Sequence, residues 1–162
     1  VDGANRKWIG TDKGLFLLDE YGAGTLTSFT RESSPLASNN VQRLAINSSS
    51  GELFVLTSGG LVSYRTTATA PSRVMQKAKI FPNPVRPGFN GVVAIEGLTY
   101  DTVVKITNEA GRLVREMVST GGTATWNLAD YNGARVASGI YIVFAATRDG
   151  SQSVVGKIAV IN

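Results

Sequence analysis

The sequence contains no cysteine and no histidine. These absences exclude a disulfide framework, a thiol nucleophile, a serine–histidine dyad and the commonest zinc ligands. No apolar run approaches the ~20 residues of a membrane-spanning helix, so we expect no membrane-spanning segment. The first residues also lack the basic and apolar segments of a signal peptide. We therefore expect an export signal to lie upstream of Val1 or to have been removed, and we interpret the chain as a C-terminal piece of a longer protein.

Patterns that would support catalysis are missing too. The acidic side chains stand isolated in turn-like or strand-end positions, and none of their pairs indicates the ~5–9 Å opposition that glycosidases use. Gly10 and Gly14 are not followed by a helical pattern, which argues against a phosphate-binding loop. We predict a protein that is not an enzyme, with no cofactor, no metal and no catalytic residue.

The composition favours an all-β fold. The 162 residues are 43% hydrophobic and 17% charged, which supplies a core and argues against disorder. Eighteen glycines against five prolines suit many short strands joined by tight turns. The formal charge of +4 comes from residues 71–162, because basic and acidic side chains balance in residues 1–70. This bias favours an acidic partner, and we do not expect nucleic acid to be that partner.

A repeat with an offset of 46 residues lies in the first part of the chain. It places Trp8-Ile9-Gly10-Thr11-Asp12-Lys13-Gly14-Leu15 on Phe54-Val55-Leu56-Thr57-Ser58-Gly59-Gly60-Leu61. A period in the forties with about four strands per repeat is typical of propeller blades. The strands expected are 7–11, 15–19, 26–30, 41–47, 53–57 and 61–65. They make about one and a half blades, an incomplete β-propeller over residues 1–65, with Trp8 and Phe54 as core residues between blades.

This pattern resembles the two-component-regulator type of propeller repeat, whose strands carry a W-I-G-T-x-x-G-L run. Residues 66–72 are small and polar and contain Pro71 near their end, which predicts a linker over residues 66–77. Seven strand-like runs follow in residues 78–162, at 78–82, 92–97, 102–108, 112–118, 123–128, 140–147 and 153–161. Seven short strands in this length predict an immunoglobulin-like β-sandwich.

Four short motifs occur in a fixed order along residues 78–162. They are Pro82-Asn83-Pro84, then Gly111-Arg112-Leu113-Val114, then Ser138-Gly139-Ile140-Tyr141-Ile142-Val143, and finally Lys157-Ile158-Ala159-Val160. From the residues themselves we expect the prolines to end the first strand. We also expect Gly111 to adopt a positive φ in a hairpin, and Gly139 to admit a backbone turn closed to other residues.

The order of these motifs resembles the C-terminal sorting domain of the bacterial type IX secretion system. The resemblance implies that eight residues carry the sorting motifs: Pro82, Asn83, Pro84, Gly111, Arg112, Gly139, Tyr141 and Lys157. It also implies an exported protein at the cell surface or outer membrane, with secretion-machine proteins as partners. Together with the propeller repeats it is similar to the PorZ-type surface components of that system. This resemblance implies membership of the surface complex that attaches cargo to anionic lipopolysaccharide.

Two other readings stay open. The sandwich could be a cleavable sorting tail on a secreted cargo protein or enzyme, or the repeats could be a fragment of a periplasmic sensor propeller. For an anionic partner such as lipopolysaccharide phosphate, the candidate residues are Lys105, Arg112, Arg115 and Arg135. Arg112 and Arg115 are three apart on an expected strand, so they line one patch only if a bulge intervenes.

Overall fold

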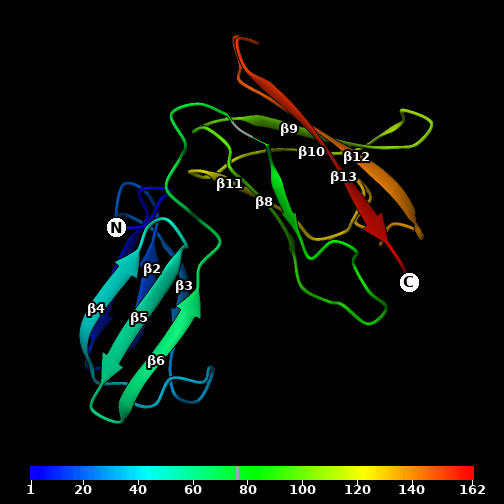
Figure 1. Cartoon of the computed structure of the whole chain (residues 1–162). Coiled ribbons are helices and arrows are strands. Elements are labelled where there is room, and N and C mark those ends of the chain that lie inside the picture. Colours follow the sequence, from blue (N-terminus) through cyan, green and yellow to red (C-terminus); the bar gives the residue numbers. More distant parts are fainter. Residues whose placement is uncertain (76) are drawn as a thin grey trace. The chain divides into compact units, whose positions relative to one another are not determined.

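The computed structural model describes residues 1–75 and 77–162, and these residues contain thirteen strands and no helix (Figure 1). The expected all-β fold is therefore confirmed. The chain divides into two compact units, Val1–Ala70 and Pro71–Asn162. No helix among the described residues could cross a membrane.

The first unit holds two antiparallel sheets of three strands each. One has the order β1-β2-β3 and the other β4-β5-β6. The strands are β1 (Lys7–Thr11), β2 (Gly14–Leu18), β3 (Thr25–Phe29), β4 (Val41–Asn47), β5 (Glu52–Thr57) and β6 (Gly60–Arg65). Each lies within one residue of the expected bounds, because alternating apolar residues and turn glycines mark strands locally. These two sheets do not close into a propeller.

The two repeats build the same hairpin. Thr11 Oγ1 donates to Gly14 O at 3.0 Å, and Thr57 Oγ1 donates to Gly60 O at 2.9 Å. Gly14 and Gly60 have φ values of 129° and 135°, a conformation that favours glycine. The offset of 46 residues therefore relates the two sheets in structure as well as in sequence.

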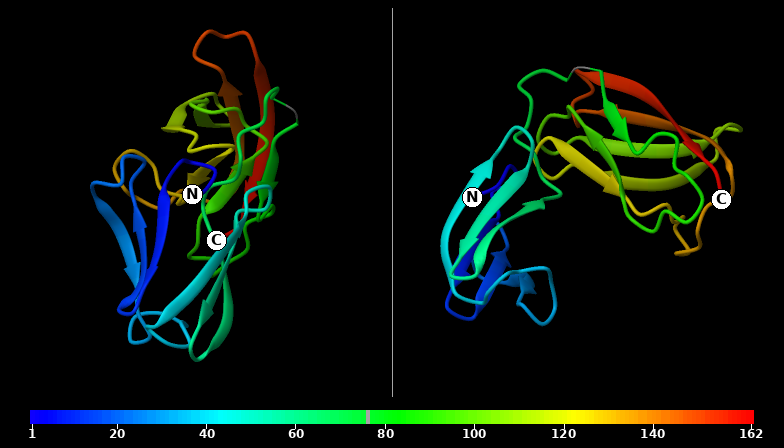
Figure 2. Two further views of the ribbon diagram at one scale, coloured as in Figure 1. Left: turned by 90° about the vertical axis from the view of Figure 1, so that its left-hand side faces the viewer. Right: turned by 60° about the horizontal axis from the view of Figure 1, so that its bottom comes forward.

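The two sheets of the first unit lie face to face (Figure 2). They pack on a shared core of Leu15, Leu36, Val41, Leu53 and Val55. Their close approach depends on Gly10, where a Cβ would lie 2.4 Å from Val41 Cγ1.

Of the two aromatic residues expected between blades, only Trp8 takes part in this core. Its ring packs against Phe29 and Tyr64, with centroids 5.9 and 5.8 Å away. Phe54 is not part of a core among the described residues, because it is 39% exposed. The pairing of β5 explains this, because Phe54 alternates with the buried Leu53 and Val55 and lies on the other face of its sheet.

The second unit is a sandwich-like pair of antiparallel sheets. One sheet has the order β11-β8-β7 and the other β10-β9-β12-β13. The strands are β7 (Lys79–Phe81), β8 (Val93–Glu96), β9 (Val103–Asn108), β10 (Leu113–Val118), β11 (Thr123–Trp126), β12 (Gly139–Ala146) and β13 (Ser153–Val160). Six of the seven expected runs contain one of these strands, and β12 begins one residue before the expected run 140–147. β12, apolar on both faces, lies inside its sheet.

The core of the second unit fills the space between its sheets. Ile95 and Trp126 contribute from one sheet, and Val104, Val143 and Ile158 from the other, all at most 1% exposed. Burying each aliphatic side chain of this kind is worth about 1.5–3 kcal/mol. The core therefore spans the whole motif-bearing part of the chain and fixes the positions of its turns.

The segment expected as a linker is divided between the two units. Thr66 N donates to Gly51 O at 2.8 Å and Ala70 N to Ser48 O at 2.7 Å, both within the first unit. In the second unit, Ser72 N donates to Leu98 O at 2.9 Å, and Met75 joins the core at 8% exposed. Gln76, also assigned to the linker, lies outside the described residues.

Candidate functional site

The motif Pro82-Asn83-Pro84 follows β7 and reaches the last strand of the chain. Asn83 Nδ2 donates to Lys157 O at 2.8 Å, and Asn83 Oδ1 accepts from Ala159 N at 3.1 Å. Val85 continues the contact, because its N donates to Ala159 O at 2.8 Å and Ile161 N donates to Val85 O at 3.0 Å. The first and last sorting motifs therefore form one structure, which we call the terminal latch.

The Gly-Arg motif forms the turn between β9 and β10. Gly111 N donates to Asn108 O at 3.0 Å, and Arg112 N donates to the side chain of Asn108 at 2.9 Å. Gly111 has a φ of 77°, as expected. A side chain there would force an L-residue into a conformation that it rarely adopts.

The motif that contains Gly139 and Tyr141 begins β12. The expectation for Gly139 is wrong, since its φ is not positive and the nearest atom to a built Cβ is on the Tyr141 ring, 4.0 Å away. Tyr141 is buried, its hydroxyl donates to Ala137 O at 2.8 Å, and its ring lies 5.5 Å from that of Trp126. Burial raises the pKa of the Tyr141 phenol, and the nearby Arg112 charge opposes that rise.

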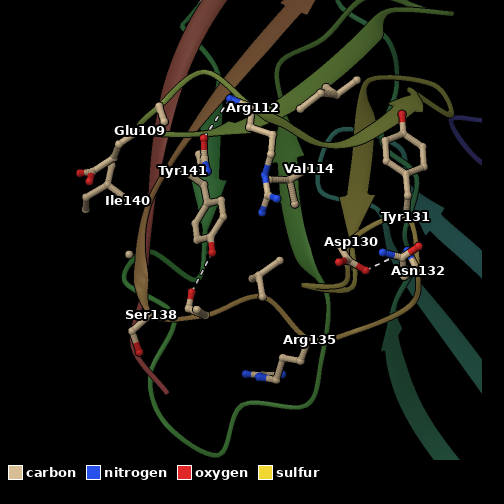
Figure 3. A pocket seen from close by; sticks show the side chains of 16 residues that line it. Glu109, Arg112, Val114, Asp130, Tyr131, Asn132, Arg135, Ser138, Ile140 and Tyr141 are labelled. Atoms are coloured by element: carbon tan, nitrogen blue, oxygen red, sulfur yellow. Dashed lines mark hydrogen bonds between the residues drawn. The ribbon is translucent and has the colours of Figure 1, made fainter.

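These two motifs meet at a cleft of about 660 Å³ (Figure 3). Its walls are the β9–β10 turn, the connection between β11 and β12, and the start of β12. The side chain of Arg112 extends into the cleft beside Tyr141, and Arg135 lies at the opposite end (Figure 3). The Asp130 carboxylate faces backbone donors within its own loop, Asn132 N at 2.8 Å and Ala134 N at 3.0 Å.

Two candidate arginines line this cleft, with different surroundings. Arg135 is held in place, because its Nη2 donates to Phe89 O at 3.0 Å and its Nε to Asn162 Oδ1 at 3.1 Å. The guanidinium of Arg112 makes no hydrogen bond or ion pair with any residue that the structure describes. It therefore keeps its donors available for an anionic group.

The other two basic candidates do not line the cleft. A bulge does occur between Leu113 and Arg115, but Arg115 Nη1 donates to Asp130 O at 3.2 Å, and its guanidinium lies 5.7 Å from the centre of the Tyr131 ring. Lys105 pairs with Glu116 across the strands at 3.5 Å. Spacing along the sequence does not show which basic residue lines the cleft and which is paired elsewhere, because each outcome depends on a tertiary neighbour.

Sequence reasoning missed three residues that position the motifs. Val85 pairs with the last strand in the latch, Asn108 caps the β9–β10 turn, and Asn162 accepts a hydrogen bond from Arg135. The turn signal Asn108-Glu109-Ala110-Gly111 offers a clue to Asn108, since asparagine commonly caps such turns. Nothing in the sequence pattern points to Val85 or Asn162. Over residues 1–75 and 77–162, no group of three or more acidic side chains is arranged to hold a metal ion.

The sequence matches a known protein family, and the chain is similar to solved structures. The family described as the secretion system C-terminal sorting domain matches residues 79–161. PorZ of Porphyromonas gingivalis, described as an essential bacterial surface component of the type-IX secretion system, is 37% identical with a TM-score of 0.64. The match covers 100% of this chain and 22% of the PorZ chain.

A second structure from the same organism, dimeric latent PorU, is 20% identical with a TM-score of 0.39. That match covers 68% of this chain and 12% of the PorU chain. No curated protein matches the chain.

Proposed function

Because the chain belongs, through residues 79–161, to the family of secretion system C-terminal sorting domains, we propose that it is a non-catalytic surface component of the type IX secretion machinery. In this proposal the protein is exported to the cell surface at the outer membrane, and the sandwich is a retained export and assembly domain. The observation that carries the proposal is the 37% identity to PorZ along the whole chain, first unit included. A cargo protein would need to share only the sorting domain.

The structure supports a role in assembly through the way the sorting motifs are grouped. Pro82, Asn83, Pro84 and Lys157 belong to the terminal latch, which holds the end of the domain. Of the other motif residues, Arg112, Gly139 and Tyr141 line the cleft. Gly111 lies in the β9–β10 turn that forms one of its walls. We assign the latch to folding of the domain and the cleft, with its exposed rim, to recognition by a secretion-machine protein.

The alternative function is a cleavable sorting tail of a secreted cargo protein, which the family match fits equally well. The two functions predict different effects of deleting the gene on the export of other proteins. A strain that lacks a machinery component stops exporting other proteins that carry sorting domains, and restoring the gene restores their export. If the strain exports those proteins normally, the chain is cargo and the machinery proposal is wrong.

We also propose that the first unit is part of an incomplete β-propeller. Its two sheets share a 46-residue repeat, matching Thr–Gly hairpins and a common core. Each sheet has one face buried against the other, while Phe54 and Leu56 on the second sheet and Ile9 on the first remain exposed. Exposed apolar faces at both ends of a repeat stack are what a ring of further blades would cover.

The cleft suggests an anionic ligand for the same domain. We propose that Arg112 and Arg135 bind a phosphate of anionic lipopolysaccharide, since guanidinium groups match phosphate oxygens in pairs. Binding of phosphorylated lipopolysaccharide to the chain should weaken about tenfold or more in Arg112→Gln. The matched control is Lys105→Gln, which removes a cation outside the cleft. Equal losses of binding in both variants would show that only the overall positive charge matters, and would refute the site.

A further inference from the structure

A bulge in β10 changes the side of the sheet on which Arg115 lies. Leu113 pairs with Thr107 of β9, and after one extra residue Arg115 pairs with Ile106. Ile106 is fully buried and belongs to the core of the second unit. Because residues directly opposite each other in a sheet share a face, the bulge turns Arg115 toward the inner side of the sheet, at its edge.

On that side, the guanidinium of Arg115 contacts the connection between β11 and β12. Its Nη1 donates to Asp130 O at 3.2 Å, and its Cζ lies 5.7 Å from the centre of the Tyr131 ring. A planar guanidinium can donate a hydrogen bond and cover an aromatic ring at the same time, whereas the ammonium of lysine is a point charge. Arg115 therefore holds this connection against β10.

The connection forms a closed loop over residues 128–136, which we call the wall loop. At its base Val136 N donates to Leu128 O at 2.9 Å, and near its tip Gly133 N donates to Asp130 O at 3.1 Å. Leu128 has a φ of 61°, a left-handed conformation that residues with a Cβ rarely adopt, and its side chain is fully buried. The wall loop therefore depends on its tertiary contacts to keep this form.

The contact of Arg115 with the wall loop also connects the two arginines that we assign to phosphate binding. Arg112 immediately precedes β10, Arg135 belongs to the wall loop, and they lie at opposite ends of the cleft (Figure 3). Two guanidinium groups bind one anionic ligand most tightly when their spacing is fixed before the ligand arrives. Arg115 is the side chain that joins the strand of the first arginine to the loop of the second.

We propose that Arg115 is a positioning residue for the phosphate-binding cleft. It does not contact the ligand, but it holds the wall loop against β10 and so fixes the spacing between Arg112 and Arg135. The inference rests on the proposed binding of phosphate in this cleft and adds a residue that acts from outside it. It also gives the bulge in β10 a role, since bulges beside binding sites commonly redirect a side chain.

The affinity of the 162-residue chain for phosphorylated lipopolysaccharide tests this role. Binding should weaken about fivefold in both Arg115→Gln and Arg115→Lys, because neither side chain makes the hydrogen bond and the ring contact together. Arg115→Lys keeps the charge, so a purely electrostatic role predicts unchanged affinity in that variant. The matched control is Lys105→Gln, which removes a cation outside the cleft. Unchanged affinity in Arg115→Lys, or equal losses in Arg115→Gln and Lys105→Gln, would overturn the proposal.

Hydrogen exchange in the absence of ligand measures the wall loop directly. The amides of Gly133 and Val136, which donate within this loop, should exchange roughly threefold faster in both Arg115 variants. The Ala159 amide in the terminal latch should keep its rate and so show that the sandwich is folded. If Arg115→Gln fails to fold, Tyr131→Ala removes the same ring contact from the loop side.

The two measurements separate this inference from the proposed function. Unchanged exchange of the wall-loop amides in folded variants would overturn the positioning role, whatever the ligand does. If the unchanged chain does not bind phosphorylated lipopolysaccharide, the phosphate site is refuted and the role of Arg115 in it is refuted too. Faster exchange in the variants would then still show that Arg115 holds the loop, so the failure would lie in the proposed ligand.

Discussion

Asn83 and Lys157, 74 positions apart in the chain, are joined by a hydrogen bond of 2.8 Å from the Asn83 side chain to the Lys157 carbonyl. The same side chain accepts from Ala159 N at 3.1 Å. One amide thus pairs with two backbone groups on the outer edge of β13, as a neighbouring strand would. The asparagine between the two prolines therefore acts here by pairing with a strand edge, which ties the first motif of the sandwich to its last.

Asn83→Ala should loosen the last strand without unfolding the sandwich. Two exposed hydrogen bonds are worth about 1 kcal/mol together, so the Ala159 amide should exchange with solvent roughly fivefold faster. Hydrogen exchange followed by NMR measures this. Asn132→Ala, in an exposed turn, is the control and should leave the Ala159 rate unchanged. Equal rates in the two variants would show that the latch bonds do not hold β13.

The second unit should fold on its own, and Met75 should add to its stability. A fragment of residues 71–162 retains the buried Met75 side chain and the bond from Ser72 to Leu98, whereas residues 78–162 lack both. Burial of a methionine contributes about 1.5–3 kcal/mol, so the longer fragment should be more stable by about 2 kcal/mol. Urea unfolding followed by Trp126 fluorescence compares them. Equal stability would show that residues 71–77 are a linker, and an unfolded longer fragment would refute independent folding.

Two motif glycines should respond differently to alanine. Gly111 has a φ of 77°, so Gly111→Ala should cost about 1 kcal/mol or more. Gly139 has open space and an ordinary backbone, so Gly139→Ala should change stability by less than about 0.5 kcal/mol. Unfolding is followed by Trp126 fluorescence in a Trp8→Phe background. A loss of export in a stable Gly139→Ala protein would assign Gly139 to recognition; a large loss of stability would contradict the structure.

Asp149 should make the second unit less stable in acid. Hydrogen bonds from the Thr147 hydroxyl, and then from Ser151, lower the pKa of Asp149 from 3.8 to about 2. A lowered pKa in the folded state stabilises the protein above about pH 4, and that contribution is lost as the pH falls through about 2. In Asp149→Asn the melting temperature should therefore fall less steeply between pH 4 and pH 2. The same slope as in the unchanged protein would exclude this carboxylate as a contributor.

The strands were predictable from the sequence because their signals are local. Alternation at Ala124 and Trp126, and turn glycines such as Gly111, mark strands and turns without knowledge of the partner strand. The resemblance to type IX sorting domains and PorZ-type components, drawn from four motifs and the repeat, is confirmed by the family match and by PorZ.

What the sequence did not predict depends on tertiary neighbours. Phe54 is exposed because no sheet covers its face in this chain, although its counterpart Trp8 is packed. Met75, expected in the linker, is instead buried in the core of the sandwich. Arg112 and Arg115 are close in sequence, yet only Arg112 points into the cleft, since Arg115 lies along Tyr131. None of these outcomes follows from spacing along one strand.

The intact mass of the mature protein at the surface of its native cells tests the central claim most directly. If the sandwich is a retained assembly domain, the mass will include every residue through Asn162. A C-terminus within residues 66–77 would contradict the account, because the sandwich would then be a sorting tail that is removed during export.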